Sequence, residues 1–482
     1  MTADPIRSES APGAAVSFPV YEIHGNRILI PKYTYLRRFY DKKKDKIEFM
    51  PDLPPRNFKF EGSLWPEQVK GVNKILKVLG KKRGATGKGR CGTGKTVMGV
   101  YLMSRINGKC AVLVDQTQIA EQWVDEVVKH LPGASISFIM PLTSQRKICK
   151  KYGLDPKDRE KIDTSGDVVI VMAQTAMRIP KEEMIPVSFL IVDEAHSFSA
   201  PSFAGCIFRF AFKYSIGFTA TDERADGLEW IFKDILGPTI VPLAGKRMDP
   251  VIATVPVTLE KEITAGQHKI FWCHKFKKMR TFWSCKICDE ASTCRALKES
   301  LSSKSKKLAY HEIWARLAND DHYNNAIIEV IRRLYKAKRN ILVLAKFKDH
   351  LRFLRDSVVA LDVPESDTSL YFGGMDKDKC LPFPITFATF GIAYKALNAK
   401  DKDAEVLAMP VSSVEQPAGR VEREVAGKKR PIIVDFVIRS APLLLGQFYK
   451  RRKFYDSMGY LHATDITQAI NLCRSNEKRR GT

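Results

Sequence analysis

The sequence predicts an α/β protein with two tandem domains, each built on a parallel sheet, together with a small N-terminal β-containing segment and an insertion between the domains. Three observations support this. The 482 residues exceed the size of a single typical domain. Short β-branched runs alternate with helical patterns, which is typical of a parallel sheet covered on both faces. A glycine-rich GRCGTGKT segment at residues 89–96 precedes a helical pattern, which is typical of a phosphate-binding loop.

The composition favours a globular protein with a polyanionic partner. Lys and Arg total 79 against 54 Asp and Glu, giving a formal charge of +25, and 44% of residues are hydrophobic. A generally solvated basic surface is the alternative explanation of the charge. No apolar run approaches the roughly 18 residues of a membrane span, and no secretion signal opens the chain. We therefore expect no membrane partner, a cytosol-like (cytoplasmic) location and reduced cysteines.

The pattern along the chain divides it into five parts. Residues 1–60 form an accessory segment with two short strands around a turn, and residues 61–247 form the first α/β domain, beginning with a helix near Leu64. Residues 248–306 form a linker with a Cys-, aromatic- and Lys/Arg-rich insertion. A second strand series begins near residue 340, within a domain at residues 307–460, and residues 461–482 form a basic tail.

The phosphate loop assigns a role to each residue type. Small residues allow successive backbone N–H groups to point at one anion, and the following helix N-terminus adds partial positive charge. Lys95 would reach the outer phosphates, and the Thr96 hydroxyl would hold a magnesium ion. A Gly/Lys-rich surface turn could match the same pattern by chance.

Further polar groups follow later strands. FLIVDEAH ends in Asp193 and Glu194, which in an ATP site would bind magnesium and orient the attacking water. Thr219 and Thr221 lie at another strand end, where hydroxyls can couple phosphate occupancy to nearby loops. An acidic pair at a surface turn and a hydroxyl-capped turn are the respective alternatives. Since ligands bind at the carboxyl ends of parallel strands, we expect these groups to share one edge with the loop.

QPAGRVER places a glutamine and two arginines at helical spacing. Arg420 and Arg423 share one helical face and could reach a phosphate from outside the first domain, with Gln416 beside them. An exposed helix with surface arginines would give the same pattern.

The order of these motifs over residues 61–460 resembles superfamily 2 helicases and translocases. The similarity is greatest to the branch with DEAH-type repair and transcription helicases and phage and large-DNA-virus helicases. The resemblance implies two RecA-like domains and ATP hydrolysis with Mg²⁺ in the cleft between them. It implies catalytic roles for Lys95, Asp193, Glu194, Gln416, Arg420 and Arg423, with Thr96 and Asp193 holding the magnesium. It further implies nucleotide contacts from Gln68, which would read adenine, and from Gly89, Gly92, Thr93, Gly94, Lys95 and Thr96. His196, Thr219 and Thr221 would couple the site to movement, and Gln174, Thr175 and Thr389 would lie near nucleic acid.

Some positions depart from the pattern of this family. Trp65 replaces the arginine that usually precedes the glutamine, Asp115 and Gln116 replace Pro-Thr, and Asp222 replaces the proline after TAT. None of these changes removes a phosphate, magnesium or water residue.

Four cysteines raise the question of a structural zinc ion. Cys285 and Cys288 form a C-x-x-C pair, with Cys273 upstream and Cys294 downstream. Thiolates in close pairs suit tetrahedral Zn²⁺. Free cysteines acting as small apolar groups are the alternative, because the outer spacings fit no familiar finger.

The leading hypothesis is an ATP-dependent helicase or branched-DNA remodeller that binds nucleic acid, with DNA favoured and without sequence specificity. Replication, repair or transcription proteins would be its protein partners, and the resemblance suggests a viral or phage protein. A duplex translocase that does not unwind, and a binding factor with slow or vestigial ATPase, are the alternatives. A strongly basic chain without a groove-reading motif should bind phosphates in a salt-dependent way.

Overall fold

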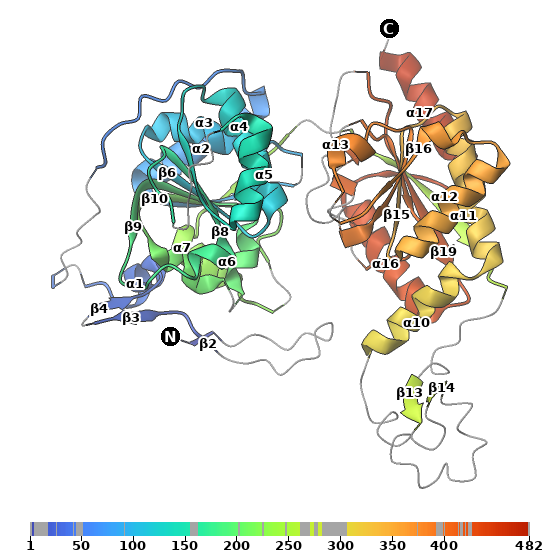
Figure 1. Ribbon diagram of the computed structural model, residues 1–482, viewed down its shortest axis with the longest axis horizontal. Helices are drawn as coiled ribbons and strands as arrows, with labels where there is room; N and C mark the ends of the chain where they lie inside the picture. Colours follow the sequence, from blue (N-terminus) through green and yellow to red (C-terminus); the bar gives the residue numbers. More distant parts are fainter. Residues whose placement is uncertain are drawn as a thin grey trace. The chain divides into compact units, whose positions relative to one another are not determined.

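The computed structural model describes two compact units, residues 1–246 and 247–482. Within them it describes all residues except 1, 4–17, 26, 42, 45–51, 91, 155–161, 201–202, 224–225, 246–247, 261–269, 274–277, 282–305, 374, 392–398, 400, 413, 415–417, 420, 423–426 and 481–482. Each unit contains a central sheet with helices on both faces (Figure 1).

The first unit has a seven-stranded sheet in the order β11-β5-β10-β9-β6-β8-β7. All of its strand pairs are parallel. The strands are β5 (Gly84–Lys88), β6 (Cys110–Val114), β7 (Ile136–Ile139), β8 (Val168–Met172), β9 (Ile185–Val192), β10 (Phe210–Thr219) and β11 (Ile240–Pro242). The prediction of a parallel sheet is therefore confirmed.

Helices cover both faces of this sheet because successive strand residues point to opposite sides. In β6, Val112 and Val114 belong to one buried cluster, whereas Ala111 and Leu113 belong to another. The first cluster includes α2 (Pro66–Lys82), α3 (Lys95–Ile106), α4 (Thr117–His130) and α5 (Leu142–Tyr152). The second includes α6 (Ala173–Ala176), α7 (Glu229–Leu236) and the 3₁₀ turns η1 (Ala195–Ser199) and η2 (Ala204–Arg209).

The buried strand β5 is poor in large apolar residues for a steric reason. A Cβ at Gly84 would lie 2.2 Å from the Leu236 carbonyl oxygen, and one at Gly87 would lie 2.8 Å from the Phe218 ring. Larger side chains would separate β5 from its neighbours. The strand is therefore built from small residues even though it is buried.

The N-terminal segment belongs to the first unit. It contains the strands β1 (Thr2–Ala3) and β2 (Phe18–Pro19), the hairpin of β3 (Glu22–His24) and β4 (Arg27–Leu29), and α1 (Lys32–Arg38). The buried Arg209 side chain makes a two-pronged ion pair with Glu22, at 2.6 and 3.2 Å. This contact anchors the hairpin, as a bidentate pair fixes geometry well.

The second unit has a seven-stranded sheet in the order β16-β17-β15-β18-β19-β12-β20, again with parallel pairs. The strands are β12 (Val251–Val257), β15 (Ile341–Ala345), β16 (Thr368–Tyr371), β17 (Ile385–Thr389), β18 (Ala404–Leu407), β19 (Ile432–Ile438) and β20 (Leu461–Ala463).

Two parts of this sheet differ from the sequence prediction. Residues 251–257 were expected in the linker, and residues 461–463 in the tail, yet they form adjacent strands. The segment 251–257 also pairs with β19 over seven positions. Both segments complete the core of the second unit, so the linker and the tail are shorter than expected.

The helices of the second unit are α10 (Lys306–Ala318), α11 (Asp321–Lys336), α12 (Lys348–Leu361), α13 (Lys377–Cys380), α16 (Pro442–Ser457) and α17 (Ile466–Arg480), with the 3₁₀ turn η3 (Glu365–Asp367). Asp320 caps α11 by accepting a bond from the Tyr323 N–H at 2.9 Å. Cys473 and Ala469 of α17 are buried. The hairpin of β13 (Ile270–Cys273) and β14 (Lys278–Thr281) lies within the predicted insertion.

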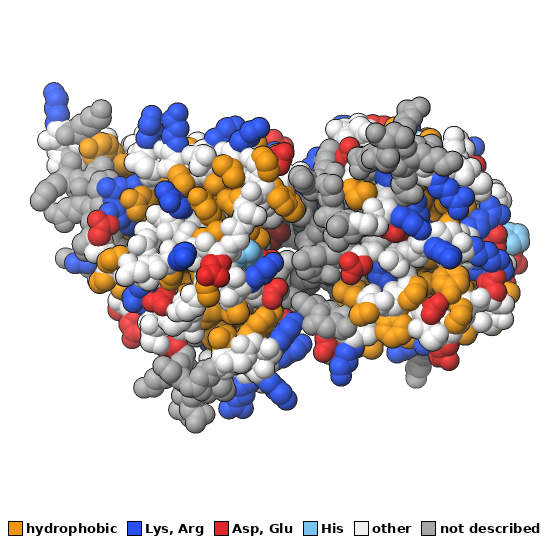
Figure 2. Space-filling model, turned by 90° about the horizontal axis from the view of Figure 1, so that it is seen from above, with side chains coloured by type: hydrophobic (Ala, Val, Ile, Leu, Met, Phe, Trp, Pro, Cys, Tyr) orange, Lys and Arg blue, Asp and Glu red, His pale blue; other side chains and the backbone are white. Residues whose placement is uncertain are grey.

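Lysine and arginine side chains are interspersed with apolar patches over the face of each unit seen in Figure 2. None of the described helices has the length and apolar character that a membrane crossing requires.

Candidate functional site

The phosphate loop lies between a buried strand and a helix, as the sequence predicts. β5 ends at Lys88, and α3 begins at Lys95. Gly92 and Gly94 have φ values of 87° and 78°, in the left-handed region that favours glycine. A Cβ at Gly94 would lie 2.1 Å from Gln68 Nε2, so no other residue fits there without displacing Gln68. Cys91 lies outside the described residues.

Lys95 occupies the inside of the loop. Its side chain is buried, with Nζ 2.8 Å from the Gly89 carbonyl oxygen and 3.4 Å from that of Arg90. Thr93 Oγ1 donates to the Arg90 carbonyl at 3.0 Å, which closes the turn. Among the described residues, this buried ammonium group is hydrogen-bonded to carbonyl oxygens, which suits a site that receives negative charge.

Gln68 fixes the loop from the outside. Its Nε2 donates to the Thr93 carbonyl at 3.2 Å, and its Oε1 accepts from the Trp65 N–H at 3.0 Å. Gln68 is buried in the first turn of α2. The structure therefore assigns this side chain a role in loop geometry, and its expected role in reading adenine stays a prediction.

Asp193 and Glu194 follow β9 at the same edge of the sheet as the loop. Asp193 is buried, and its Oδ2 accepts a hydrogen bond from Trp123 Nε1 at 2.8 Å. Its Oδ1 accepts from the Glu194 N–H at 2.9 Å. Glu194 has φ 48°, an uncommon backbone conformation for a residue with a side chain. The Asp193 carboxyl group is thus held in place by two hydrogen bonds.

Burial and the charge of Glu194 raise the pKa of Asp193 to about 6, while Lys95 and the bond from Trp123 lower it. The raised pKa reflects a carboxyl group that is removed from water and lies next to a second carboxyl group. A cation bound beside it would favour the ionised form.

The end of β10 connects directly to the loop. The Gly89 N–H donates to the Thr219 carbonyl at 2.9 Å. His196 Nδ1 lies 3.1 Å from Thr219 Oγ1, and Thr219 Oγ1 donates to the Thr221 carbonyl at 2.5 Å. Because the threonine uses its proton on Thr221, His196 Nδ1 is the donor in the first contact. These bonds bring together the residues predicted to couple the site.

A second link joins the same two segments. Lys88 Nζ lies 2.6 Å from Asp222 Oδ1. Partial burial raises the pKa of Asp222, but the hydrogen bond and charge of Lys88 outweigh it and hold the pKa below its ordinary value. Asp222, which replaces the proline of the family pattern, therefore links the TAT turn to the last residue of β5, directly before the phosphate loop.

The residues present fit a nucleotide triphosphate with magnesium. A Mg²⁺ ion in such a site takes one or two protein ligands and completes its shell with phosphates and water. The Thr96 hydroxyl at the start of α3 and the buried Asp193 carboxylate are suitable ligands. Among the described residues no group of three or more His, Cys, Asp or Glu could hold a metal on its own.

The expected nucleic-acid residues lie at carboxyl ends of strands. Gln174 is exposed in α6 after β8, and its Nε2 donates to the Asp115 carbonyl at 3.1 Å. Thr175 is half-buried beside it. Thr389 is the last residue of β17 in the second unit. Their contact with nucleic acid stays a prediction.

Several predicted residues cannot be placed. Gln416, Arg420 and Arg423 lie outside the described residues, as do Cys285, Cys288 and Cys294. Cys273 ends β13. The zinc hypothesis stays open, and metal analysis of the purified protein with and without Cys285→Ser tests it.

Neighbours of the two arginines are nevertheless well anchored. Ala418 and Val421 are fully buried, and the Tyr460 hydroxyl donates to the buried Glu422 carboxylate. The Met248 N–H donates to the Glu422 carbonyl at 2.8 Å. Ala418, Val421 and Glu422 are thus fixed to the core of the second unit.

Sequence reasoning missed two residues that shape the site. Trp123 belongs to the AEQW sequence in α4, but nothing in its pattern shows that its ring reaches Asp193. Asp222 stood out as a departure from the family pattern, and this departure was the available signal.

Comparisons with known proteins show which sequences and structures this chain is similar to. Residues 61–224 match the family described as type III restriction enzyme, res subunit. A putative ATP-dependent RNA helicase of Acanthamoeba polyphaga mimivirus is 22% identical over 448 residues, covering 92% of this chain and 77% of that protein. Another, from African swine fever virus strain Badajoz 1971 Vero-adapted, is 24% identical and covers 77% of this chain and 68% of that protein.

A solved structure, the Sulfolobus solfataricus SWI2/SNF2 ATPase core in complex with dsDNA, shares 14% identity with a TM-score of 0.36, covering 80% of this chain and 90% of that one. The family and relative matches confirm the predicted resemblance to superfamily 2 helicases of viral type, and they support the predicted class of ATP hydrolase.

Proposed function

We propose that this superfamily 2 helicase-like chain is an ATP-driven motor that moves along or unwinds nucleic acid. The observation that carries the proposal is the edge of the first sheet. There Lys95 inside the loop and the buried Asp193 lie close enough for the lysine charge to lower the carboxyl pKa. Glu194 follows directly, and the Gly89–Thr219 bond joins the loop to the TAT turn.

Each residue has a distinct task in this proposal. Lys95 exchanges its carbonyl partners for phosphate oxygens, and the N–H groups at the start of α3 receive the same anion. Thr96 and Asp193 hold Mg²⁺, which when bound neutralises charge developing on the phosphates. Glu194 orients the water that attacks the outer phosphate.

Coupling to movement would pass through the end of β10. His196 contacts Thr219 at 3.1 Å and lies 3.5 Å from Glu194 Oε2. A change at Glu194 during hydrolysis would therefore alter the hydrogen bonding of Thr219. Since the Thr219 carbonyl also binds the Gly89 N–H, the TAT turn and the phosphate loop would respond together.

The second unit would complete the reaction with arginines. Arg420 and Arg423, with Gln416 beside them, would approach the phosphates from the second domain and make ATP hold the two units together. Hydrolysis would remove that attraction, and a strand bound by both units would be gripped alternately. Gln174, Thr175 and Thr389 would supply part of that grip.

The nucleic acid is either DNA or RNA. The sequence analysis favoured DNA, whereas the names of both viral relatives refer to RNA. The high positive charge suits both polymers equally. A translocase that follows a duplex without unwinding it is the second candidate.

Two substitutions test the proposal together. Lys95→Ala and Arg420→Ala are each expected to abolish nucleic-acid-stimulated ATPase, whereas Lys74→Ala, an exposed lysine of α2, is expected to keep it. Wild-type turnover in the Lys95 variant would contradict the assignment of the loop. Wild-type turnover in the Arg420 variant would contradict only the role of the second unit.

A further inference from the structure

A basic cavity lies at the edge of the second sheet opposite the carboxyl ends of its strands. It has a volume of about 280 Å³ and is lined by Lys336, Ala337, Lys338, Arg339, Lys429, Ile470 and Arg474. The first four residues form the end of α11 and the turn into β15, and Lys429 precedes β19. We call this cavity the amino-end pocket, because it lies where the parallel strands begin.

The lining of the amino-end pocket is almost entirely cationic. Five of its seven residues are lysine or arginine, and none is acidic. Like charges brought together raise the free energy of the folded state unless an anion joins them. An anion bound in the pocket would therefore lower the free energy of the folded state.

Two of the cations are fixed by the surrounding backbone. Arg339 is buried, and its Nη1 donates to the Arg430 carbonyl at 2.8 Å and lies 3.7 Å from Asp403 Oδ1. Lys429 Nζ lies 2.8 Å from the Lys338 carbonyl and 3.3 Å from that of Ala337. The Lys429 bonds cap the end of α11, and the Arg339 bond ties the same turn to the segment before β19.

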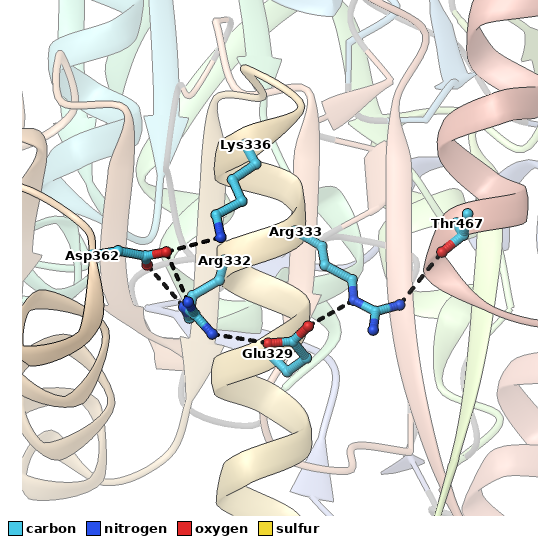
Figure 3. A network of polar contacts seen from close by, with 6 residues as sticks. All are labelled: Glu329, Arg332, Arg333, Lys336, Asp362 and Thr467. Atoms are coloured by element: carbon cyan, nitrogen blue, oxygen red, sulfur yellow. Dashed lines mark hydrogen bonds and ion pairs between the residues drawn. The ribbon is translucent and has the colours of Figure 1, made fainter.

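The nearby carboxylates are already occupied, as Figure 3 shows. Asp362 accepts two bonds from Arg332, at 2.8 and 2.7 Å, and lies 2.9 Å from Lys336 Nζ. The Arg332 hydrogen bonds, followed by that of Lys336, hold the pKa of Asp362 well below its ordinary value. Glu329 is shared between Arg332 and Arg333 on the other side of α11.

Lys338 and Arg474 make no ion pair with any acidic side chain in the described part of the chain. Both are exposed at the mouth of the pocket. Lys338 is held at φ 53° in the turn after α11, which positions its side chain next to the fixed pair of Arg339 and Lys429. Lys338 and Arg474 can therefore move to contact a ligand, whereas Arg339 and Lys429 are held in fixed positions.

We propose that the amino-end pocket binds a phosphate group, and that this phosphate belongs to the polynucleotide on which the protein acts. The assignment of this phosphate to a polynucleotide rests on the proposed function. Arginine offers a planar fork to phosphate oxygens and lysine offers a mobile point charge, so the set matches a phosphate monoester or diester. The pocket would hold nucleic acid at the opposite edge of the second sheet from the strand end that carries Thr389.

The expected loss of nucleic-acid affinity on removing cations from the pocket follows from counterion release. Affinity for single strands varies with salt with a slope of about −0.7 per neutralised phosphate, so each lost contact weakens binding about 5-fold near 0.1 M salt. Removing both mobile cations should weaken binding about 25-fold and reduce the slope by about 1.4.

The test compares the full-length double variant Lys338→Asn, Arg474→Gln with the control Lys77→Gln, Arg105→Gln. Asparagine tolerates the left-handed conformation at position 338. The control removes the same charge from exposed sites of α2 and α3. Binding of labelled oligo(dT) and oligo(U) is measured by fluorescence anisotropy at several salt concentrations, and ATPase without nucleic acid confirms that each variant is folded.

The proposal is supported if the pocket variant alone loses about 25-fold in affinity for the oligonucleotides and shows the smaller dependence of affinity on salt. Equal effects of the two variants, or none, overturn it. A second arm measures the rise in melting temperature caused by inorganic phosphate. If the pocket variant loses this rise but keeps its affinity for both polymers, the pocket binds free phosphate and the polynucleotide assignment is overturned. If the wild type binds neither polymer, the proposed function fails, and the phosphate arm alone decides the nature of the pocket.

Discussion

Gly99 makes room for Trp123, whose ring binds the proposed magnesium ligand Asp193, and Gly99→Ala should disturb this contact. A Cβ at Gly99 would lie 2.4 Å from Cη2 and 2.9 Å from Cζ3 of Trp123. Trp123 is fully buried, and its Nε1 is bonded to Asp193. The ring cannot yield without lengthening that bond.

The size of the effect follows from two opposing terms. Overpacking of a well-filled core costs about 1–3 kcal/mol, and the gain of alanine over glycine in a helix returns about 1 kcal/mol. The net loss of up to about 2 kcal/mol corresponds to a melting temperature lowered by up to about 4–8 °C in a unit of this size.

Gly80→Ala in α2 is the matched control, because nothing lies within 4 Å of its added Cβ. It should raise the melting temperature by about 2–4 °C and leave the ATPase unchanged. Calorimetry and steady-state ATPase at several Mg²⁺ concentrations measure both variants. If Gly99→Ala matches Gly80→Ala in stability and in Mg²⁺ dependence, the packing argument for Trp123 is refuted.

The remaining predictions concern single contacts. Trp123→Phe removes a hydrogen bond to a carboxylate worth about 1.5–3 kcal/mol and should raise the Mg²⁺ concentration needed for half-maximal ATPase roughly 10-fold or more, as a magnesium titration measures. Asp222→Ala breaks the contact with Lys88 and should weaken stimulation by nucleic acid more than basal ATPase; equal losses in both assays would argue against a coupling role. Burial lowers the pKa of His350 from 6.5 to about 4, so its neutral form contributes stability that is complete above about pH 6.5 and lost as pH falls towards 4. Urea unfolding against pH should show a loss approaching 3 kcal/mol from this group, and His350→Gln should remove that part of the acid sensitivity.

The strands could be predicted because local composition identifies them. Runs such as residues 110–114 and 168–172 are entirely buried, and their apolar, β-branched residues predict buried strands. The loop could be predicted because its backbone conformation requires glycines, and these glycines give the recognisable pattern GRCGTGKT. The common edge of the loop, Asp193 and Thr219 followed from the rule that parallel strands end together.

Other features depend on pairings that no short window contains. Residues 251–257 are a short, mainly apolar run, and only their partner β19, about 180 residues later, assigns them to the second sheet. The Trp123–Asp193 bond spans 70 positions, and the Lys88–Asp222 pair joins two segments that follow different strands. The amino-end pocket gathers cations from three separate segments, so the sequence shows only scattered basic residues.

ATPase activity measured in parallel with single-stranded DNA, duplex DNA, forked DNA and RNA tests the central claim most directly. We expect at least one of these polymers to stimulate hydrolysis, and we expect Glu194→Gln to remove that stimulation while ATP binding persists. Stimulation by none of the four polymers would contradict a nucleic-acid motor and favour a binding factor with slow ATPase.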